Sequence, residues 1–357
     1  MLTRCSAEES TIILSPPARD QQSYRHEAFL WHDAEAFVAG LLPFVEEGLE
    51  LGEPVMVAMI DEHASWLRDA LGSQADEVRF VDMRVLGRNP ATIIPGWQHF
   101  LDAEGADSRP TRGIGEPIWA GRRSEEVLEC QLHEALLNVA VDPKVPFWLI
   151  CPYDVGHLDA AVIDEAHRSH PAIIETNSYQ GSPRYRGRAH VDEMLAAPLD
   201  RPPGRPVQIP FSARNLSRLV SFVKLEGHVA GLSPEQAADL ASATHRLASS
   251  SLARGADSGI IRIWSHGQAV VCDVIDDTFV DDPLAGRRAP YQDDSDGLWS
   301  ANQLCDLVQL RSTPDGTTVR VHAWRRPESS ESSLTQWRSI PSMGSQVGMG
   351  GSSSAGR

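Results

Sequence analysis

Short apolar runs alternate with amphipathic segments along the first half of the chain. Brief apolar runs between polar or turn-forming residues are typical of buried strands, whereas apolar residues three or four apart indicate helices packed on a core. The pattern predicts strands at 28–31, 54–60, 78–81, 111–115 and 146–151, and helices at 34–49, 63–71, 90–104, 124–141 and 160–170. Because strands and helices alternate, we predict an α/β domain with a mostly parallel sheet and helices on both faces.

The second half of the chain has a different order of elements. Strands are predicted at 207–211, 259–265, 269–274, 307–312 and 317–323, and helices at 213–230, 233–252 and 298–306. Ser233 and Pro234 suit the N-cap and first position of a helix. Strands and helices that follow one another in this way predict an α+β sandwich. A loop of about twenty residues at 276–296 is long enough to suggest a function.

A stretch rich in Pro, Gly and Arg separates the two halves and lacks long apolar periodicity, which marks a domain boundary. A chain of 357 residues is also about twice the usual length of one domain. We therefore expect a flexible arm at 1–23, a first domain at 24–190, a linker at 191–206, a second domain at 207–326 and a disordered tail at 327–357.

The charge balance restricts the possible partners. The formal net charge is −17, which opposes nucleic-acid binding, because that affinity comes largely from Lys and Arg that neutralise phosphates. Eighteen consecutive apolar residues occur nowhere, and the first residues lack both a long apolar core and a small-residue cleavage site. We expect a cytoplasmic protein without direct contact to nucleic acid or membrane.

The cysteines do not form a disulfide framework. They are five in number and scattered, which is unusual for a stapled fold, so we expect reduced thiols. Cys130 and His133 share one face of a predicted helix, and with Cys151 at a strand they suggest a metal or redox site. Two ligands at this spacing are weak support, and buried cysteine is a common core residue, so we favour the core interpretation and predict no metal.

A glycine-rich stretch, Gly113 to Gly121, follows a predicted strand. Such glycines let the backbone approach a ligand or turn sharply, and the sequence leaves both interpretations open. It is not a phosphate loop, because Trp119 to Gly121 offer neither the Lys nor the hydroxyl residue that a Walker-type loop needs.

Several segments of the first half together resemble the MEDS sensory domain, named for methanogen and methylotroph sensors. They are Tyr24 to Leu30, FVEEGLELGEPVMV at 44–57, Arg88-Asn89-Pro90, Gly113 to Gly121, Cys130 to Asn138, and Cys151 to Asp154. The resemblance covers about residues 24–175 and implies a RecA-like sensory domain for an unidentified small-molecule signal. Ligands of doubly wound sheets bind at the carboxyl ends of the strands. We therefore predict a sensory pocket formed by His32, Gly113, Gly115, Glu116, Trp119 and Tyr153.

The second half resembles the GHKL ATPase fold, and most of all the kinases that act as anti-sigma factors. The resemblance rests on Asp281 to Arg287, Gly297 to Asp306 and Gly316 to Arg320, and covers about residues 207–324. The two domains in this order resemble the RsbA-type anti-sigma regulators.

The catalytic groups of that family are replaced here. In the family a helix supplies a Glu general base and, four residues on, an Asn that helps to hold Mg²⁺; the matching positions are Arg246 and Ser250. Loss of a positioned base lowers a rate by about 10²- to 10⁴-fold, so we predict no catalytic residues, a doubtful Mg²⁺ and negligible kinase activity. Arg246 could contact a phosphate and allow weak ATP binding, or be a solvated helix charge, and both stay open.

The resemblance also implies a partly preserved adenine site. The family has Asp-x-Gly at a strand end; this chain keeps Asp276 and has Thr278 in place of the glycine. Gly297 and Thr318 stand at matching places. The predicted nucleotide-binding residues are thus Asp276, Thr278, Gly297 and Thr318.

Three functional hypotheses follow. The first is a bacterial signalling regulator whose degenerate ATPase-like domain binds a sigma factor or its antagonist. The second is an active ATP-dependent serine/threonine kinase of such an antagonist. An enzyme acting through Cys130 and His133 ranks below both. The acidic chain suits a basic partner surface, such as the DNA-binding regions of a sigma factor.

Overall fold

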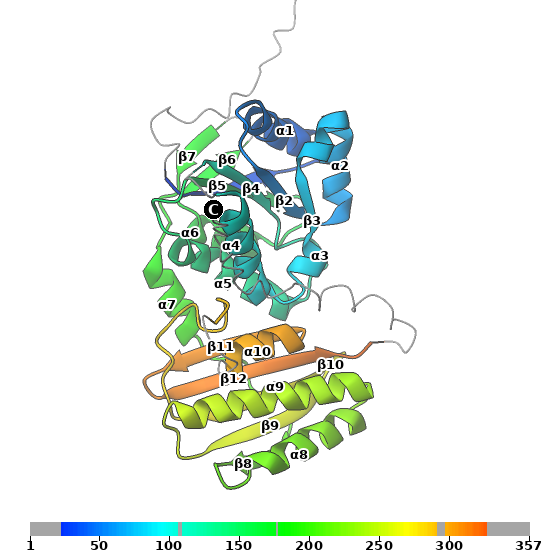
Figure 1. Cartoon of the computed structure of the whole chain (residues 1–357), viewed down its shortest axis with the longest axis vertical. Coiled ribbons are helices and arrows are strands. Elements are labelled where there is room, and N and C mark those ends of the chain that lie inside the picture. The colour runs from blue at the N-terminus through cyan, green and yellow to red at the C-terminus, as the bar shows by residue number, and fades with distance from the viewer. Residues whose placement is uncertain (1–22, 106–108, 176–177, 291–296, 327–357) are drawn as a thin grey trace, which may run out of the picture.

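The computed structural model describes residues 23–105, 109–175, 178–290 and 297–326. Apart from Ser23, the predicted arm at 1–23 lies outside these residues, as do the predicted tail at 327–357 and the end of the long loop. Two separate sheets build the fold (Figure 1). Within the described ranges, no helix combines the length and apolarity needed to cross a membrane.

The first sheet has seven strands in the order β3-β2-β4-β5-β1-β6-β7. Every neighbouring pair is parallel except β6 and β7. The strands are β1 (Arg25–Trp31), β2 (Val55–Met59), β3 (Arg79–Asp82), β4 (Thr111–Gly115), β5 (Phe147–Asp154), β6 (Ala172–Glu175) and β7 (Ser178–Gly181). Strands β6 and β7 were not predicted from the sequence, and β7 adds an antiparallel edge.

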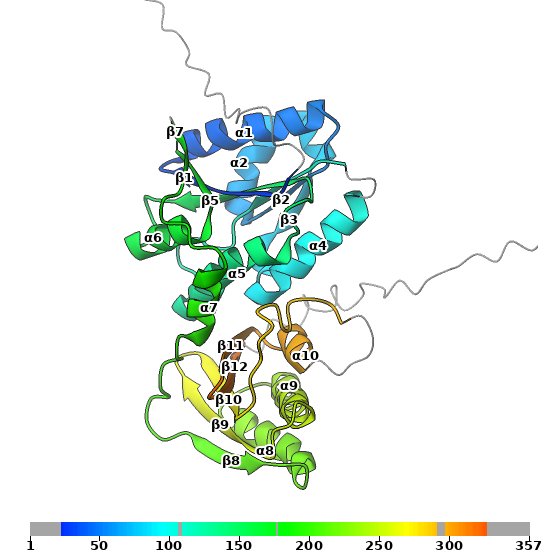
Figure 2. The same ribbon diagram turned by 90° about the vertical axis from the view of Figure 1, so that its left-hand side faces the viewer.

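Helices cover both faces of this sheet, so two cores form. Side chains of a strand alternate between faces: Ala28 and Leu30 of β1 enter one core, and Phe29 and Trp31 enter the other. Helices α1 (Ala34–Glu50) and α2 (Asp61–Leu71) cover the second core. The first is covered by α3 (Met83–Leu86), α4 (Ile93–Glu104), α5 (Ser124–Ala140), α6 (Ala160–Ser169) and α7 (Arg188–Ala196). Short 3₁₀ turns lie at Gly72–Glu77 (η1) and Pro90–Thr92 (η2). Figure 2 shows the two layers, and the predicted α/β architecture is confirmed.

The second sheet is antiparallel, with five strands in the order β11-β12-β10-β9-β8. Its strands are β8 (Val207–Phe211), β9 (Gly259–His266), β10 (Ala269–Asp276), β11 (Leu307–Thr313) and β12 (Gly316–Trp324). Helices α8 (Leu216–Val229), α9 (Pro234–Ala253) and α10 (Gly297–Leu304) pack on one face over a separate core (Figure 2). Ser233 and Gln236 form a capping box that starts α9. The narrower RecA-like and GHKL assignments stay predictions.

The connection between the sheets begins later than the sequence suggested. Residues 191–196, assigned to the predicted linker, form the last two turns of α7, which spans nine residues. This helix packs against α5 and reaches strand β11 of the second sheet. His190 and Val191 are its buried residues, so the apolar pattern is too short to reveal a helix. Residues 197–206 carry no helix or strand and lead into β8.

Candidate functional site

The residues of the predicted sensory pocket do not gather in one place. Tyr153 is buried in the core beneath α5, with its ring 5.6 Å from that of His170. Glu116 instead contacts His63 of α2, on the opposite layer of the domain. His32 is exposed, and the ring of Trp119 lies 4.3 Å from the guanidinium of Arg122. The sheet therefore separates residues that the sequence placed together.

The glycines of the predicted pocket make room for other side chains of the protein. A Cβ at Gly113 would lie 2.8 Å from Phe147 and 2.9 Å from Trp97, and one at Gly115 would lie 3.0 Å from Trp97. Helix α4 packs its indole directly on strand β4 at this point. Of the two open interpretations of the motif, this contact favours close packing over ligand approach.

Glu116 is held within an aromatic cluster at the end of β4. Its Oε1 lies 2.6 Å from Nδ1 of His63, and its Oε2 accepts a hydrogen bond from the Ile60 amide at 3.4 Å. The rings of Trp31 and Trp66 lie 5.2 and 4.7 Å from the His63 ring. Burial raises the pKa of Glu116, and contact with His63 only partly offsets this effect. The carboxyl group is thus satisfied by protein groups.

A second constellation lies beneath α5 and combines four buried side chains from four elements. His26 comes from β1, Glu134 from α5, Cys151 from β5, and His170 from the end of α6. One ligand atom of each lies within 4.8 Å of the others. Glu134 Oε2 lies 2.9 Å from His26 Nε2 and 3.2 Å from His170 Nε2, and Cys151 Sγ lies 3.4 Å from His26 Nε2. We call this set the His-Glu-Cys cluster.

Hydrogen bonds on the far sides of the two imidazoles determine where their protons are. The Asn138 amide group donates to backbone carbonyls, most closely that of Ser169 at 2.8 Å, so its Oδ1 is left to accept from His26 Nδ1 at 3.2 Å. His170 Nδ1 lies 2.9 Å from the Ala166 carbonyl and must donate to it. In neutral imidazoles both Nε2 atoms therefore carry lone pairs.

These lone pairs point at a carboxylate, so acceptors face acceptors. His170 Nε2 and Glu134 Oε1 find no hydrogen-bond partner among the described residues. Burial and the neighbouring His170 ring lower the pKa of His26, which opposes protonation of that ring. Burial would raise the pKa of Glu134, but contacts with His170 and His26 outweigh burial and lower it. In its neutral form the cluster has the Cys151 thiol as a donor, 3.4 Å from His26 Nε2, and no donor for His170 Nε2 among the described residues.

Sequence reasoning raised Cys151 as a possible ligand and discounted it, and did not relate it to the other three members of this cluster. The sequence placed Cys130 and His133 on one helix face as possible ligands. In the structure the Cys130 thiol instead donates to the Pro117 carbonyl oxygen, 3.2 Å away. Burial raises the pKa of the Cys130 thiol to about 12 and lowers that of His133 to about 3. Both residues are buried and uncharged, which agrees with the interpretation of this pair as core residues.

The predicted nucleotide-binding residues of the second domain are only partly adjacent. Asp276 ends β10, and its carboxylate accepts hydrogen bonds from Ser251 and from the backbone amide of Thr278 at 2.8 Å, as well as from the Thr278 hydroxyl. Arg254 adds a longer contact at 3.5 Å. In the antiparallel register Asp276 pairs with Thr317, whereas Thr318 pairs with Ile275. Paired residues share a face, so Thr318 points away from Asp276.

The remaining positions of that site lie on α9 and at the start of α10. A Cβ at Gly297 would lie 2.5 Å from the Arg246 carbonyl oxygen, so this glycine allows α10 to pack closely on α9. Arg246 lies 3.5 Å from Ser300 Oγ, and Ser250 Oγ accepts from Arg254 at 2.9 Å. Ser250 thus helps to position the Arg254 side chain, which also contacts Asp276.

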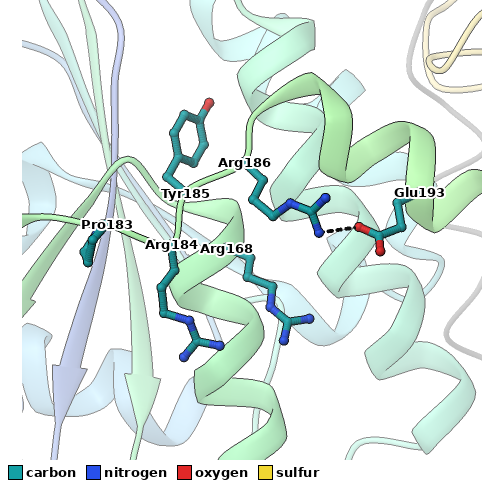
Figure 3. Close-up of a pocket in the computed structure, with 6 residues that line it drawn as sticks. All are labelled: Arg168, Pro183, Arg184, Tyr185, Arg186 and Glu193. Atoms are coloured by element: carbon teal, nitrogen blue, oxygen red, sulfur yellow. Dashed lines mark hydrogen bonds and ion pairs between the residues drawn. The ribbon is translucent and has the colours of Figure 1, made fainter.

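Two surface pockets contain charged side chains that already have partners. One is lined by Arg168, Pro183, Arg184, Tyr185, Arg186 and Glu193 (Figure 3). Its arginines are paired with carboxylates: Arg186 with Glu193 at 2.6 Å, and Arg168 and Arg184 with Asp164. The other pocket lies between residues 196–202 and the open face of the second sheet, where Thr318 is found. There Arg320 forms a two-point ion pair with Asp273.

Helix α5 also carries the main polar contact between the two domains. Glu129 is almost completely buried, and its Oε1 accepts from Arg311 at 2.8 Å and from Gln309 at 3.4 Å. Its Oε2 accepts from Arg287 at 3.2 Å. Figure 2 shows α5 and α7 between the first sheet and β11.

A second group of contacts extends this interface. Asn89 donates to the backbone and side-chain oxygens of Asn302, both at 3.0 Å, and Arg88 pairs with Asp306 at 2.6 Å. The guanidinium of Arg123 lies 4.5 Å from the Trp324 ring. The two domains therefore meet through specific polar groups as well as through α7.

Comparison with known proteins identifies the first domain. The family model described as MEDS, the methanogen/methylotroph, DcmR sensory domain, matches residues 25–171, which confirms the predicted resemblance. A comparison with curated proteins found no match. A similar solved structure is that of the RsbU and RsbW domains of Rv1364c from Mycobacterium tuberculosis, at 18% identity and a TM-score of 0.27. That match spans 36% of this chain and 34% of the other, too little to assign the second domain.

Proposed function

Residues 25–171 are a MEDS sensory domain, and from this premise we propose that the chain is a signalling regulator. In this proposal the sensory domain controls a second domain that binds a protein of sigma-factor control without phosphorylating it. The observation that carries the proposal is the buried contact of Glu129, on sensory helix α5, with Arg287 and Arg311 of the second domain.

A buried ion pair responds strongly to small displacements. Separating a buried carboxylate from its cations destabilises the folded arrangement by about 3–5 kcal/mol. A shift of α5 that moved Glu129 away from the two arginines would therefore favour a different arrangement of the domains. Glu134 lies further along the same helix, in contact with β1 and the end of α6. A change at the sensory core therefore has a direct route to β11 through one helix.

The second domain is better suited to binding than to phosphoryl transfer. Arg246 and Ser250 stand where the resemblance implies a base and a metal ligand. The predicted adenine-binding carboxylate of Asp276 is already occupied by hydroxyl and amide donors of the chain. The net charge of −17 favours a partner with a basic surface.

The proposal is tested by measuring binding of the full chain to purified candidate sigma factors and antagonists, at low and high ionic strength. We expect binding without nucleotide that weakens with salt, and a different affinity for the Glu129→Ala variant. An affinity that did not change with ionic strength would contradict recognition of a basic partner surface. Phosphate incorporation into an antagonist with Mg-ATP would instead support the kinase hypothesis.

A further inference from the structure

The His-Glu-Cys cluster has the composition of a metal site. We propose that His26, Glu134, Cys151 and His170 bind one divalent transition-metal ion, zinc in the first instance, at a closed site in the sensory core. Imidazole nitrogen, carboxylate oxygen and thiolate sulfur are the ligand types that zinc accepts in tetrahedral sites.

Three of the six separations between the ligand atoms are close to those around such an ion, and all six are within 4.8 Å. Zinc bonds of about 2.0–2.3 Å arranged tetrahedrally place neighbouring ligand atoms roughly 3.3–3.8 Å apart. The separations of Glu134 Oε2 from His170 Nε2 (3.2 Å) and of Cys151 Sγ from His26 Nε2 (3.4 Å) are close to this range. Glu134 Oε2 and His26 Nε2, at 2.9 Å, would have to move slightly apart to reach this range.

The proton positions give an independent argument. Both Nε2 atoms carry lone pairs because both Nδ1 atoms donate to oxygens, of Asn138 and of Ala166. The Cys151 thiol, 3.4 Å away, can donate to His26 Nε2, but no described donor serves His170 Nε2. A cation accepts lone pairs from both rings at once. An outer Nδ1–H bond to a carbonyl oxygen is also the arrangement that usually orients metal-binding histidines.

Charge balance points in the same direction. The four side chains are 0–2% exposed, so a net charge there would be strongly disfavoured. A divalent ion bound to the carboxylate of Glu134 and the thiolate of Cys151 forms a neutral unit, while the histidines bind as neutral imidazoles. On binding, the Cys151 thiol releases its proton to solvent. Metal binding at this site is therefore coupled to the release of one proton, because zinc is bound by the thiolate and not by the thiol.

Metal analysis of the full chain tests this proposal, whatever the outcome for the proposed function, because it needs no partner and no signal. The chain is purified without chelator, incubated with Zn²⁺ or Co²⁺, and desalted. We expect about one bound ion per chain, and in the cobalt form a sulfur-to-metal charge-transfer absorption. The Cys151→Ser variant should lose that absorption, and the matched Cys130→Ser variant in the same core should keep it.

A further variant keeps all four ligands. Asn138→Ala removes the oxygen that accepts from His26 Nδ1, and loss of such an outer contact weakens metal affinity roughly 10- to 100-fold, measured by competition with a chromophoric chelator. Desalted wild-type protein without bound metal would overturn the proposal, even if no variant folds. So would a cobalt form that lacks the sulfur absorption, or Cys151→Ser protein that retains it.

Discussion

Oε1 of Glu129 lies 2.8 Å from Nη2 of Arg311, and this contact joins the middle of sensory helix α5 to the edge strand of the second sheet. The two residues are 182 positions apart in the chain. An unpaired β edge invites association with other chains. Here α7 and the sensory domain lie against β11, so the same contacts protect the edge and couple the domains.

We first predict that Glu129→Ala separates the domains. Removing the carboxylate leaves Arg287 and Arg311 in a buried interface without their anion, which destabilises the docked arrangement by about 3–5 kcal/mol. Limited proteolysis should then cleave faster within residues 197–206, and small-angle scattering should show a larger radius of gyration. Glu50→Ala, which removes an exposed carboxylate from the end of α1 in the layer formed by α1 and α2, is the control and should change stability within about 0.5 kcal/mol. Equal cleavage rates in the two variants would refute the coupling.

The second prediction concerns nucleotide. Calorimetric titration of the full chain with Mg-ATP, and with ATP in EDTA, should give no binding heat, because Asp276 already accepts bonds from Ser251 and Thr278. Arg246 and Ser250 also lack the groups that would hold a metal-bound phosphate. Metal-dependent binding in the micromolar range would show that the site survives, and would revive the kinase hypothesis.

Most elements could be predicted from the sequence, because apolar runs and helical spacing reflect local burial. Helix α7 was missed because its buried part is confined to His190 and Val191. Thr318 and Thr317 differ by one position, and only the register of β10 with β12 shows which of them shares a face with Asp276.

The His-Glu-Cys cluster could not be predicted from the sequence for a different reason. It depends on the pairing of β1 with β5, which brings His26 and Cys151 together across 125 positions. No local spacing motif relates these residues, and the motif that was visible, Cys130 with His133, belongs to the core. Topology, and not composition, creates this site.

The third prediction separates the two interpretations of the glycine motif. Gly113→Ala forces a Cβ to within 2.8 Å of Phe147 and 2.9 Å of Trp97, and such overpacking costs about 1–3 kcal/mol. Chemical denaturation monitored by tryptophan fluorescence measures the loss. Gly181→Ala in strand β7 is a suitable comparison, because its nearest neighbour, the Pro171 carbonyl oxygen, is 3.9 Å away. Equal stability of the two variants would contradict the packing role of Gly113.

The last prediction is a pH dependence that originates at His322, a buried residue of β12. Burial and the nearby Arg320 lower the pKa of His322 from 6.5 to about 3. Between these two values the unfolded chain binds a proton that the folded chain excludes. Stability therefore falls as pH decreases from 6.5 toward 3, with a slope from this residue of up to about 1.4 kcal/mol per pH unit.

A substitution isolates this contribution from those of other titrating groups. His322→Gln can still donate to Gln309, which lies 3.0 Å from His322 Nε2, but it does not titrate. The free energy of unfolding of this variant should decrease less steeply than that of the wild type between pH 6.5 and 4, measured by urea denaturation. His228 is an exposed residue of α8, and the control variant His228→Gln should follow the wild-type curve. A His322→Gln curve parallel to the wild type would mean that His322 accepts its proton in the folded protein, and that the Gln309 contact is made by a charged ring.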